Sequence, residues 1–397
     1  FTERIEFDGK EISREALAHH TELCLKAADR MMSEGFESPT EFELVTAVGL
    51  SYFAEEKADF VILEVGLGGK GDSTNICDKP IVTAITSIAF DHMAQLGNTL
   101  ELTADKAGIL KADVPAVVCV PDAGPMEVIR ARAKELRAPL IDVTKFRVEN
   151  IREDLGGSRF DAVLEGFSEL RSFFADAEKN PAGGSARFGD REFPRQNGGK
   201  RQASDPQFKN IEISMHGRHQ ISNALCALSM IEVMRETGIL MTEEKIRRGM
   251  KKAVQKARFE IVEKSPYVIL DGAHNPAGAK ALTETVLTHF SGKRILLCVG
   301  ILKDKACREM AELLTALRAD LILTNVPNPR TMEAGELADI FLSFDLYGKR
   351  EREMAVIPDW AEAVAQAEER KGDYDLVLWA GSLYLMGEVR RRITCRK

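Results

Sequence analysis

The fold is decided by residues 59–92, which read DFVILEVGLGGKGDSTNICDKPIVTAITSIAFDH. Two short apolar runs, 60–65 and 81–90, flank a glycine-rich segment, and both contain several β-branched residues. Such runs are typical of strands buried on both faces of a parallel sheet. Glu64 lies near the end of the first run, and Asp91 and His92 follow the second. Because open parallel sheets bind ligands beyond the carboxyl ends of their strands, we expect the carboxylate of Glu64 and the imidazole of His92 at one place.

The glycine-rich segment also fits another type of site. Gly66, Gly68 and Gly71 have the spacing of a dinucleotide-binding fingerprint, and Asp91 follows about 20 residues later. That fingerprint requires a helix opening at the glycines, whereas Pro80 and the second apolar run follow almost at once. A crossover that contains a helix needs roughly 10–12 residues, so there is no room for one here, and NAD binding is disfavoured. A simple turn between neighbouring strands remains one possible interpretation of the glycines. We favour the other, a loop that lets substrate and metal approach the backbone.

Bulk composition indicates an ordinary globular protein. The chain has 397 residues, 44% hydrophobic and 29% charged, which favours two domains. A net charge of −8 gives no reason to expect nucleic acid or an anionic membrane as partner. The seven cysteines are scattered, which predicts reduced thiols in a cytoplasm, and Cys119 and Cys298 read as core residues. We expect a monomer that acts on small molecules.

The remaining pattern predicts alternating helices and strands. Asp8 and Gly9 indicate a hairpin turn, and the segment 165–210 is expected to be a mobile insertion because it contains few aliphatic residues. Near 254–260 a second, doubly wound α/β unit should begin. Helices are expected at about 13–34, 40–52, 99–109, 125–136, 219–236 and 243–254, and strands at about 115–120, 140, 267–271, 295–299, 321–324, 355–357 and 376–379.

Several polar residues allow both a structural and a functional interpretation. Thr40 and Glu43 have the spacing of a capping box, so capping and substrate contact stay equally open. Lys106 lies inside a predicted helix, where a surface lysine is the default. Gln220 and Asn223 lie one turn apart at the start of an apolar helix, where they either reach a ligand or cap a turn.

A polar cluster follows the first strand of the second unit. Asp271, His274 and Asn275 come directly after the apolar run 267–270. A lone polar group there could cap a helix, but a cluster at a strand end more often forms a site.

Taken together, these motifs resemble the folylpolyglutamate synthase and dihydrofolate synthase family of the Mur ligases. The resemblance runs over almost the whole chain outside the insertion, and it depends on the order and spacing of many short segments. Those segments are 1–5, 39–43, 63–69, 72–75, 91–92, 105–109, 217–220 with 223–224, 258–260, 271–276 and 381–384.

The resemblance implies an α/β fold with two domains. Residues 1–254 would form a mostly parallel-sheet ATP- and folate-binding domain, and 255–397 a smaller Rossmann-like domain. It implies an ATP-dependent ligase that phosphorylates a carboxylate of dihydropteroate, or of the terminal glutamate of a folate. The amine of L-glutamate then attacks the acyl phosphate, leaving ADP and phosphate. Closure of the two domains would keep water from the acyl phosphate.

Site residues follow from the same resemblance. Glu64 and His92 match Mg²⁺ ligands, and Lys106 matches a lysine whose carbamate would hold a second metal ion. The residues expected to contact ATP are Gln220, Asn223, Arg258 and Asp271; those expected to contact substrate are Thr40, Phe42, Asp72, Asn75 and His274. Lys106, Asp271 and His274 are expected to be catalytic.

Two departures from the family pattern are visible. The phosphate loop, a Gly-Thr-x-Gly-Lys-Gly-Ser type turn, normally precedes the segment that matches Phe1 and is absent here. The chain therefore reads as amino-terminally truncated, and as it stands we expect no turnover of ATP. Gln255, Lys256 and Ala257 replace the usual Trp-Pro-Gly before Arg258, which leaves the direction of Arg258 open. The alternatives are another Mur-type amino-acid ligase and a non-catalytic chain that binds folate or nucleotide; an enzyme that uses NAD ranks behind both.

Overall fold

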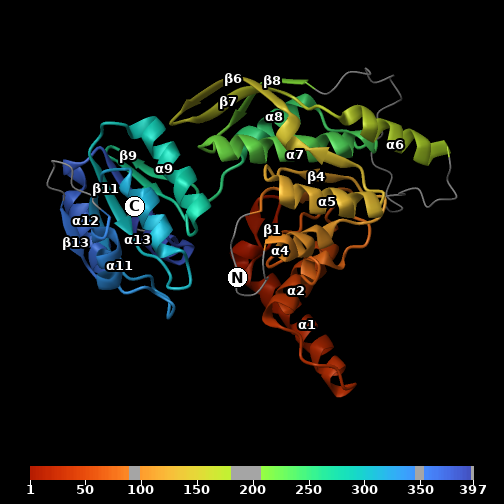
Figure 1. Cartoon of the computed structure of the whole chain (residues 1–397). Coiled ribbons are helices and arrows are strands. Elements are labelled where there is room, and N and C mark those ends of the chain that lie inside the picture. The colour runs from red at the N-terminus through yellow and green to blue at the C-terminus, as the bar shows by residue number, and fades with distance from the viewer. Residues whose placement is uncertain (89–98, 180–206, 345–352, 395–397) are drawn as a thin grey trace. The chain divides into compact units, whose positions relative to one another are not determined.

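Two compact units make up the chain in this computed structural model, which describes residues 1–88, 99–179, 207–344 and 353–394 (Figure 1). Phe1–Ile85 and Asp122–Leu140 belong to the first unit, together with the helical segment around Lys106. Val117–Pro121 and Ile141–Lys397 belong to the second.

The first unit opens with the predicted hairpin. Asp8 and Gly9 have φ angles of 50° and 74°, the positive values that a tight hairpin turn requires. The α-helices that follow were predicted to within a few residues, whereas the short helices η1 and η2 were not predicted. In chain order the unit contains η1 (Thr2–Arg4), β1 (Glu6–Phe7), β2 (Lys10–Glu11), α1 (Arg14–Ser33), α2 (Glu41–Glu55), η2 (Ser73–Ile76), β3 (Thr83–Ile85), α4 (Thr99–Lys106), η3 (Ala107–Ile109) and α5 (Ala123–Glu135).

The first apolar run does not form the predicted strand. Residues 60–65 belong to no strand that the structure describes, and the side chain of Ile62 is 94% exposed. Among the described residues 81–88, the second run contributes the three residues of β3. This strand pairs in a sheet with the order β3-β4-β5, in which β4 is Ala116–Val118 and β5 is Leu140–Asp142. An apolar sequence becomes a strand only where a neighbouring strand satisfies its main-chain groups. No described strand pairs with 60–65, so the prediction was wrong there.

A three-stranded antiparallel sheet with the order β6-β7-β8 was not predicted. The exposed positions of its strands carry many charged residues. The alternation of apolar and polar residues is therefore harder to recognise than a continuous apolar run. The sheet and the helices around it are η4 (Val143–Lys145), β6 (Arg147–Asp154), β7 (Gly157–Val163), α6 (Phe167–Lys179), β8 (Gln207–Ile213), α7 (Arg218–Glu236) and α8 (Glu243–Lys252).

The expectation of a mobile insertion over 165–210 was wrong at both ends. Phe167 and Leu170 of α6 are buried, and so are Phe208 and Ile211 of the adjoining strand β8. A few apolar residues at the right spacing therefore order the ends of this polar segment. Residues 180–206 lie outside the described part of the chain.

The carboxyl-terminal sheet has the order β13-β12-β11-β14-β10-β9, and all its strands except β9 run parallel. This is the predicted doubly wound sheet, since the connections alternate between strand and helix. Its elements are β9 (Glu260–Lys264), β10 (Tyr267–Leu270), α9 (Pro276–Phe290), β11 (Ile295–Val299), α10 (Cys307–Thr315), β12 (Asp320–Leu323), α11 (Ala334–Leu342), β13 (Met354–Val356), α12 (Trp360–Arg370), η6 (Lys371–Asp373), β14 (Leu376–Ala380) and α13 (Leu383–Thr394).

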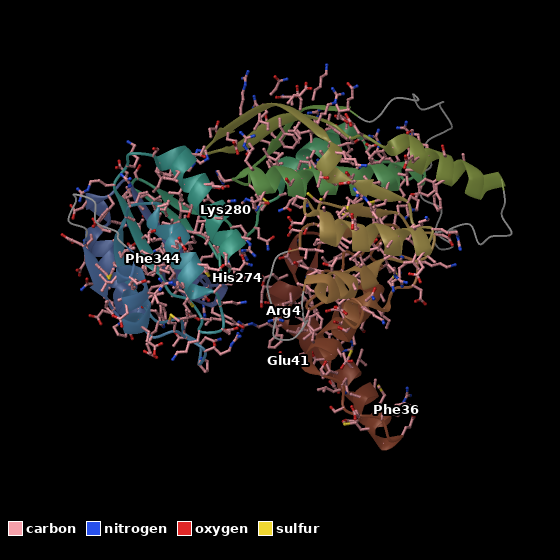
Figure 2. The ribbon with its side chains drawn as sticks, in the orientation of Figure 1. Arg4, Phe36, Glu41, His274, Lys280 and Phe344 are labelled. Atoms are coloured by element: carbon pink, nitrogen blue, oxygen red, sulfur yellow. The ribbon has the colours of Figure 1, made fainter. Side chains whose placement is uncertain are left out.

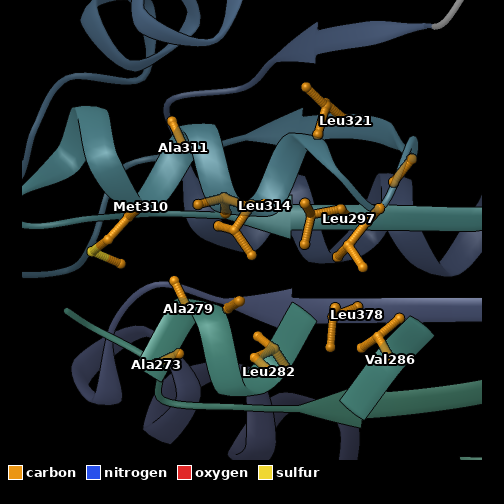
Figure 3. Packing of buried hydrophobic residues seen from close by; sticks show 14 of the residues in the cluster. Ala273, Ala279, Leu282, Val286, Leu297, Met310, Ala311, Leu314, Leu321 and Leu378 are labelled. Atoms are coloured by element: carbon orange, nitrogen blue, oxygen red, sulfur yellow. The ribbon is translucent and has the colours of Figure 1, made fainter. Parts of the chain in front are cut away.

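Helices cover both faces of this sheet. Leu297 and Leu378 point to the face covered by α9, α10 and α11, where Leu282 and Leu314 pack against them (Figure 3). Alternate strand residues such as Trp379 belong to the core under α12 and α13. Burying each such side chain contributes roughly 1.5–3 kcal/mol, so both faces hold the strand ends in fixed positions.

Candidate functional site

The glycine-rich segment folds as a loop around the carboxylate of Asp72. Oδ2 of Asp72 accepts hydrogen bonds from the amides of Gly66 and Leu67, at 3.0 and 2.9 Å. Oδ1 accepts from the amide and the hydroxyl of Thr74, at 2.9 and 2.5 Å. Burial acts to raise the pKa of Asp72, but these hydrogen bonds outweigh it and hold the pKa below its ordinary value. Asp72 therefore shapes the loop, and its contact with substrate stays a prediction.

The loop packs directly against the segment that carries Lys106. The amide of Lys70 donates to the carbonyl of Asp105 at 3.0 Å. A Cβ atom on Gly69 would lie 2.7 Å from the same carbonyl oxygen, and one on Gly108 would lie 2.4 Å from Cβ of Lys70. Only glycine allows these approaches, because any side chain would push the two segments apart. The structure thus brings Lys106, at the end of α4, beside the loop as the sequence suggested.

Asn75 joins these two segments through its side-chain amide. Nδ2 donates to the carbonyls of Lys70 and Gly108, at 3.2 and 3.3 Å. The main-chain oxygen of Asn75 in turn accepts from Nζ of Lys111 at 3.0 Å. Lys111 was not among the expected residues, and its only signal in the sequence is a basic group one turn beyond the motif 105–109. Asn75 has a structural role here, and its contact with substrate stays a prediction.

Thr40 and Phe42 lie at the start of α2, and Phe42 borders the loop. Oγ1 of Thr40 accepts from the amide of Glu43 at 3.3 Å, and Glu43 accepts from the amide of Thr40 at 2.7 Å, so the capping box is confirmed. The ring of Phe42 lies over Gly66, where a Cβ atom would come within 2.6 Å of Cζ. Phe42 therefore covers one side of the loop. Substrate contact by Thr40 or Phe42 stays a prediction.

The predicted metal ligands are only partly described. Glu64 is exposed and lies on the irregular segment before the loop. His92 lies outside the described residues, so its distance from Glu64 stays a prediction. Within the described ranges, no group of three or more His, Cys, Asp and Glu side chains could hold a metal ion. An exposed carboxylate is nevertheless the kind of hard oxygen ligand that Mg²⁺ prefers, with the other positions left to water or phosphate.

In the second unit, Asp271 holds the segment that carries Arg258. Oδ2 of Asp271 accepts from the amide of Phe259, and Oδ1 accepts from the amide of Ala273, both at 2.8 Å. Burial raises the pKa of Asp271, although these two bonds and the charges of Arg258 and His274 act against the rise. Asp271 therefore supports the main chain next to Arg258, and direct roles in catalysis or nucleotide binding stay predictions.

His274 lies in the turn between β10 and α9, ahead of the first residue of that helix (Figure 2). Its Nδ1 lies 2.9 Å from the carbonyl oxygen of Gly272. A carbonyl oxygen only accepts, so Nδ1 of His274 is the donor in this hydrogen bond. Asn275 caps α9 by accepting from the amide of Gly278 at 2.8 Å. The hydrogen bond to Gly272 thus fixes the orientation of the His274 ring just before α9.

Gln220 and Asn223 form a hydrogen-bonded pair on α7. Nδ2 of Asn223 donates to Oε1 of Gln220 at 3.1 Å, and Nε2 of Gln220 lies 3.1 Å from Nε2 of His219. His219 is exposed as a residue, yet neighbouring groups desolvate its ring; this desolvation and the charge of Arg258 lower its pKa. The charge of Arg258 is thus felt at the first turn of α7, and nucleotide binding by Gln220, Asn223 and Arg258 stays a prediction.

Known proteins resemble this chain over its whole length. Residues 18–231 match the Mur ligase middle domain, and residues 257–383 match the glutamate ligase domain of Mur ligases. The dihydrofolate synthase/folylpolyglutamate synthase of Bacillus subtilis is 33% identical over 99% of this chain and 81% of its own length.

Solved structures agree with the sequence matches. The folylpolyglutamate synthase of Thermotoga maritima has a TM-score of 0.76 at 29% identity, over 100% of this chain and 80% of its own. An Escherichia coli structure in complex with DHPP and ADP has a TM-score of 0.74 at 26% identity, over 100% of this chain and 80% of its own. No described helix is long and apolar enough to cross a membrane.

Proposed function

Because the chain belongs to the folylpolyglutamate synthase and dihydrofolate synthase family of the Mur ligases, we propose that it joins L-glutamate to a pterin-linked carboxylate. The class of the enzyme is an ATP-dependent ligase. The observation that supports the active site most directly is the packing of the glycine loop against Lys106, which is maintained by Gly69 and Gly108. The carboxylate substrate is dihydropteroate, the terminal glutamate of a folate, or both.

The proposed reaction has two steps. An oxygen of the substrate carboxylate attacks the γ-phosphorus of ATP, and the bond to the bridging oxygen of ADP breaks. The amine of L-glutamate then attacks the acyl carbon, the carbon–oxygen bond to phosphate breaks, and the amine proton goes to a base. Positioning and charge stabilisation provide most of the rate in such phosphoryl transfers.

The two described groups of residues have different proposed roles. The loop, Phe42 and the segment of Lys106 bind the pterin and its carboxylate. Asn223, Gln220 and Arg258 bind the nucleotide, and His274 is the base that accepts the amine proton. We also propose the domain division at residue 254, with nucleotide-binding groups on both sides of it.

Magnesium is the proposed metal: Glu64 and His92 would hold one ion, and a carbamate of Lys106 would hold a second. When bound, it neutralises the negative charge on the phosphate oxygens. The chemistry of an exposed carboxylate such as Glu64 fits this ion. The role of Glu64 is then to place that charge beside the loop, where the carboxylate substrate must lie to be phosphorylated.

The test is the release of ADP by the protein expressed from its complete gene. Mg-ATP, L-glutamate and dihydropteroate or tetrahydrofolate are supplied together and then omitted one at a time. We expect ADP only when all are present. ADP release that needs glutamate but no pterin would indicate another Mur-type ligase. ADP release in no mixture, together with binding of nucleotide or folate, would indicate a non-catalytic binding protein.

A further inference from the structure

Three aromatic rings from different segments meet beside Arg258. His216 lies between β8 and α7, Phe259 lies just before β9, and His289 lies near the end of α9. The ring centroids of His216 and Phe259 are 5.0 Å apart, those of His216 and His289 are 6.1 Å apart, and those of Phe259 and His289 are 6.3 Å apart. His216 is 8% exposed and Phe259 is 4% exposed. We call these three residues the ring cluster.

The main chain around Arg258 needs this support. Ala257 and Phe259 have φ angles of 56° and 47°, so Arg258 lies between two left-handed residues that are not glycine. Each such residue costs on the order of 1 kcal/mol and persists only where its surroundings hold it. Asp271 holds the amide of Phe259, while the ring cluster holds its side chain.

The connection that carries His216 is linked to Arg258 through Phe259 and through the charge of Arg258. His219, three residues after His216, has its pKa lowered in part by the charge of Arg258. Phe259 directly follows Arg258 in the chain, and its ring packs on His216, which lies on the connection between β8 and α7. A shift of His216 would consequently move Phe259 and change the direction in which Arg258 leaves the main chain.

We propose that His216 is a positioning residue for Arg258, and that it does so as an uncharged ring packed against Phe259. This inference rests on the proposed function, in which Arg258 binds the nucleotide. His216 lies outside the segments that carry the family resemblance, directly before the segment 217–220. Because histidine can take up a proton, the contact would weaken in acid, and binding of ATP would weaken with it.

The surroundings of His216 favour the uncharged ring. Its Nε2 has no hydrogen-bond partner among the described residues. Burial lowers the pKa of His216, and His289 on α9 adds to this effect, whereas a hydrogen bond to the main chain of Leu155 and the charge of Asp154, at the end of β6, oppose it. The ion pair of Arg218 with Glu153 lies on the same connection, 2.9 Å between Nε and Oε2. A charged ring would leave one N–H buried without an acceptor.

The sign of the pH effect follows from the lowered pKa. As the pH falls below about 6.5, the ordinary value for histidine, the unfolded segment takes up a proton before the packed ring does. The stabilisation from the uncharged ring is therefore present above that pH and is lost below it. His219 also has a lowered pKa, so a variant of His216 itself is needed to assign the effect.

Hydrogen exchange of the Phe259 amide tests the contact independently of catalysis. In the wild type we expect its protection to fall about tenfold between roughly pH 7.5 and pH 5.5 after correction for intrinsic rates. His216→Phe keeps a ring but cannot be protonated, so its protection should stay constant over this range. In His216→Ala, the protection of the Phe259 amide should be about tenfold lower than in the wild type already at roughly pH 7.5. His19→Phe, which removes an exposed histidine of α1, should behave as the wild type.

Kinetics of the complete protein provide the second measurement. His216→Ala should raise KM for ATP about five- to tenfold with little change in kcat, because it weakens positioning of a binding group. His216→Phe should restore the wild-type KM and remove its increase in acid. Unchanged protection of Phe259 in His216→Ala, or a pH dependence that persists in His216→Phe, would overturn the inference. Failure of the proposed function would be seen separately, as a wild type that releases no ADP.

Discussion

The amide of Phe259 donates a 2.8 Å hydrogen bond to Oδ2 of Asp271, and this bond ties the segment of Arg258 to the end of strand β10. The other oxygen of Asp271 accepts from the amide of Ala273 in the turn that leads to His274. One carboxylate therefore orients two segments that carry predicted site residues. A polar residue after a strand can thus contribute to a site by orienting the main chain to which it is hydrogen-bonded.

Replacing Asp271 by asparagine tests this role. Asparagine has one acceptor oxygen in place of two, so one of the two amides loses its partner. We expect Asp271→Asn to lower the free energy of unfolding by about 1–3 kcal/mol and to raise KM for ATP. Urea unfolding and steady-state kinetics measure the two effects. Asp122→Asn is the matched control, because no cap hydrogen bond from Asp122 is found in the described part of the chain. Equal stability of the two variants would contradict the role.

The carboxylate of Asp72 should make the loop sensitive to acid. Its pKa is lowered in the folded protein, so on acidification the unfolded chain binds a proton before the folded chain does. The stabilisation is present above the ordinary value of about 3.8–3.9 and is lost as the pH falls through the lower, folded value. We expect the wild type to be more stable than Asp72→Asn at about pH 6, with a difference that shrinks below about pH 4. A difference that does not change with pH would contradict this account.

The close approach of the loop to the Lys106 segment predicts a sharp contrast between two glycines. A Cβ atom at Gly69 would meet the carbonyls of Asp105 and Lys106 at 2.7 and 2.9 Å, whereas one at Gly71 would meet no described atom within 4 Å. We expect Gly69→Ala to reduce kcat/KM roughly ten- to hundredfold, because small displacements of reacting groups are costly. Gly71→Ala, in the same loop, should keep activity within about twofold. An equal loss of kcat/KM in the two variants would show that the spacing between the loop and the Lys106 segment is not critical.

Glu64 should matter for activity and not for stability. It is exposed and lies outside the described strands, so Glu64→Gln should leave the thermal transition within about 1 °C of the wild type. Loss of a magnesium ligand should nevertheless reduce ADP release at least a hundredfold or so, as chelation of Mg²⁺ should in the wild type. Glu56→Gln, an exposed glutamate next to α2, is the control and should retain activity. A Glu64→Gln variant that keeps activity but melts earlier would point to a structural role.

Continuous apolar runs allowed most of the carboxyl-terminal sheet to be predicted. The run 295–299 is buried on both faces and forms β11 with the bounds that were expected. A similar run at 60–65 did not form a strand. The difference lies in the partners, since β11 is hydrogen-bonded on both sides by β12 and β14 and no described strand pairs with 60–65. An apolar sequence permits a strand, and hydrogen bonding to neighbouring strands decides whether one forms.

The site was predictable as a set of segments and less so in its details. Spacing placed the glycine loop among the candidates and the family resemblance added Lys106, and the structure brings the two segments together. The structural roles of Asp72, Asn75 and Asp271 could not be predicted, because their hydrogen bonds depend on backbone positions that only the folded chain defines. His216 gave no signal, since a single histidine near the start of a helix is common and its ring partners lie 43 and 73 residues away in the sequence.

The central claim, that this ligase activates a carboxylate as an acyl phosphate, is tested most directly by isotope transfer. The substrate carboxylate of dihydropteroate or tetrahydrofolate is labelled with oxygen-18 and incubated with the complete protein, Mg-ATP and L-glutamate. The account predicts one labelled oxygen in the inorganic phosphate for each amide formed, because the oxygen that attacked ATP leaves with the phosphate. Amide formed with unlabelled phosphate would contradict it.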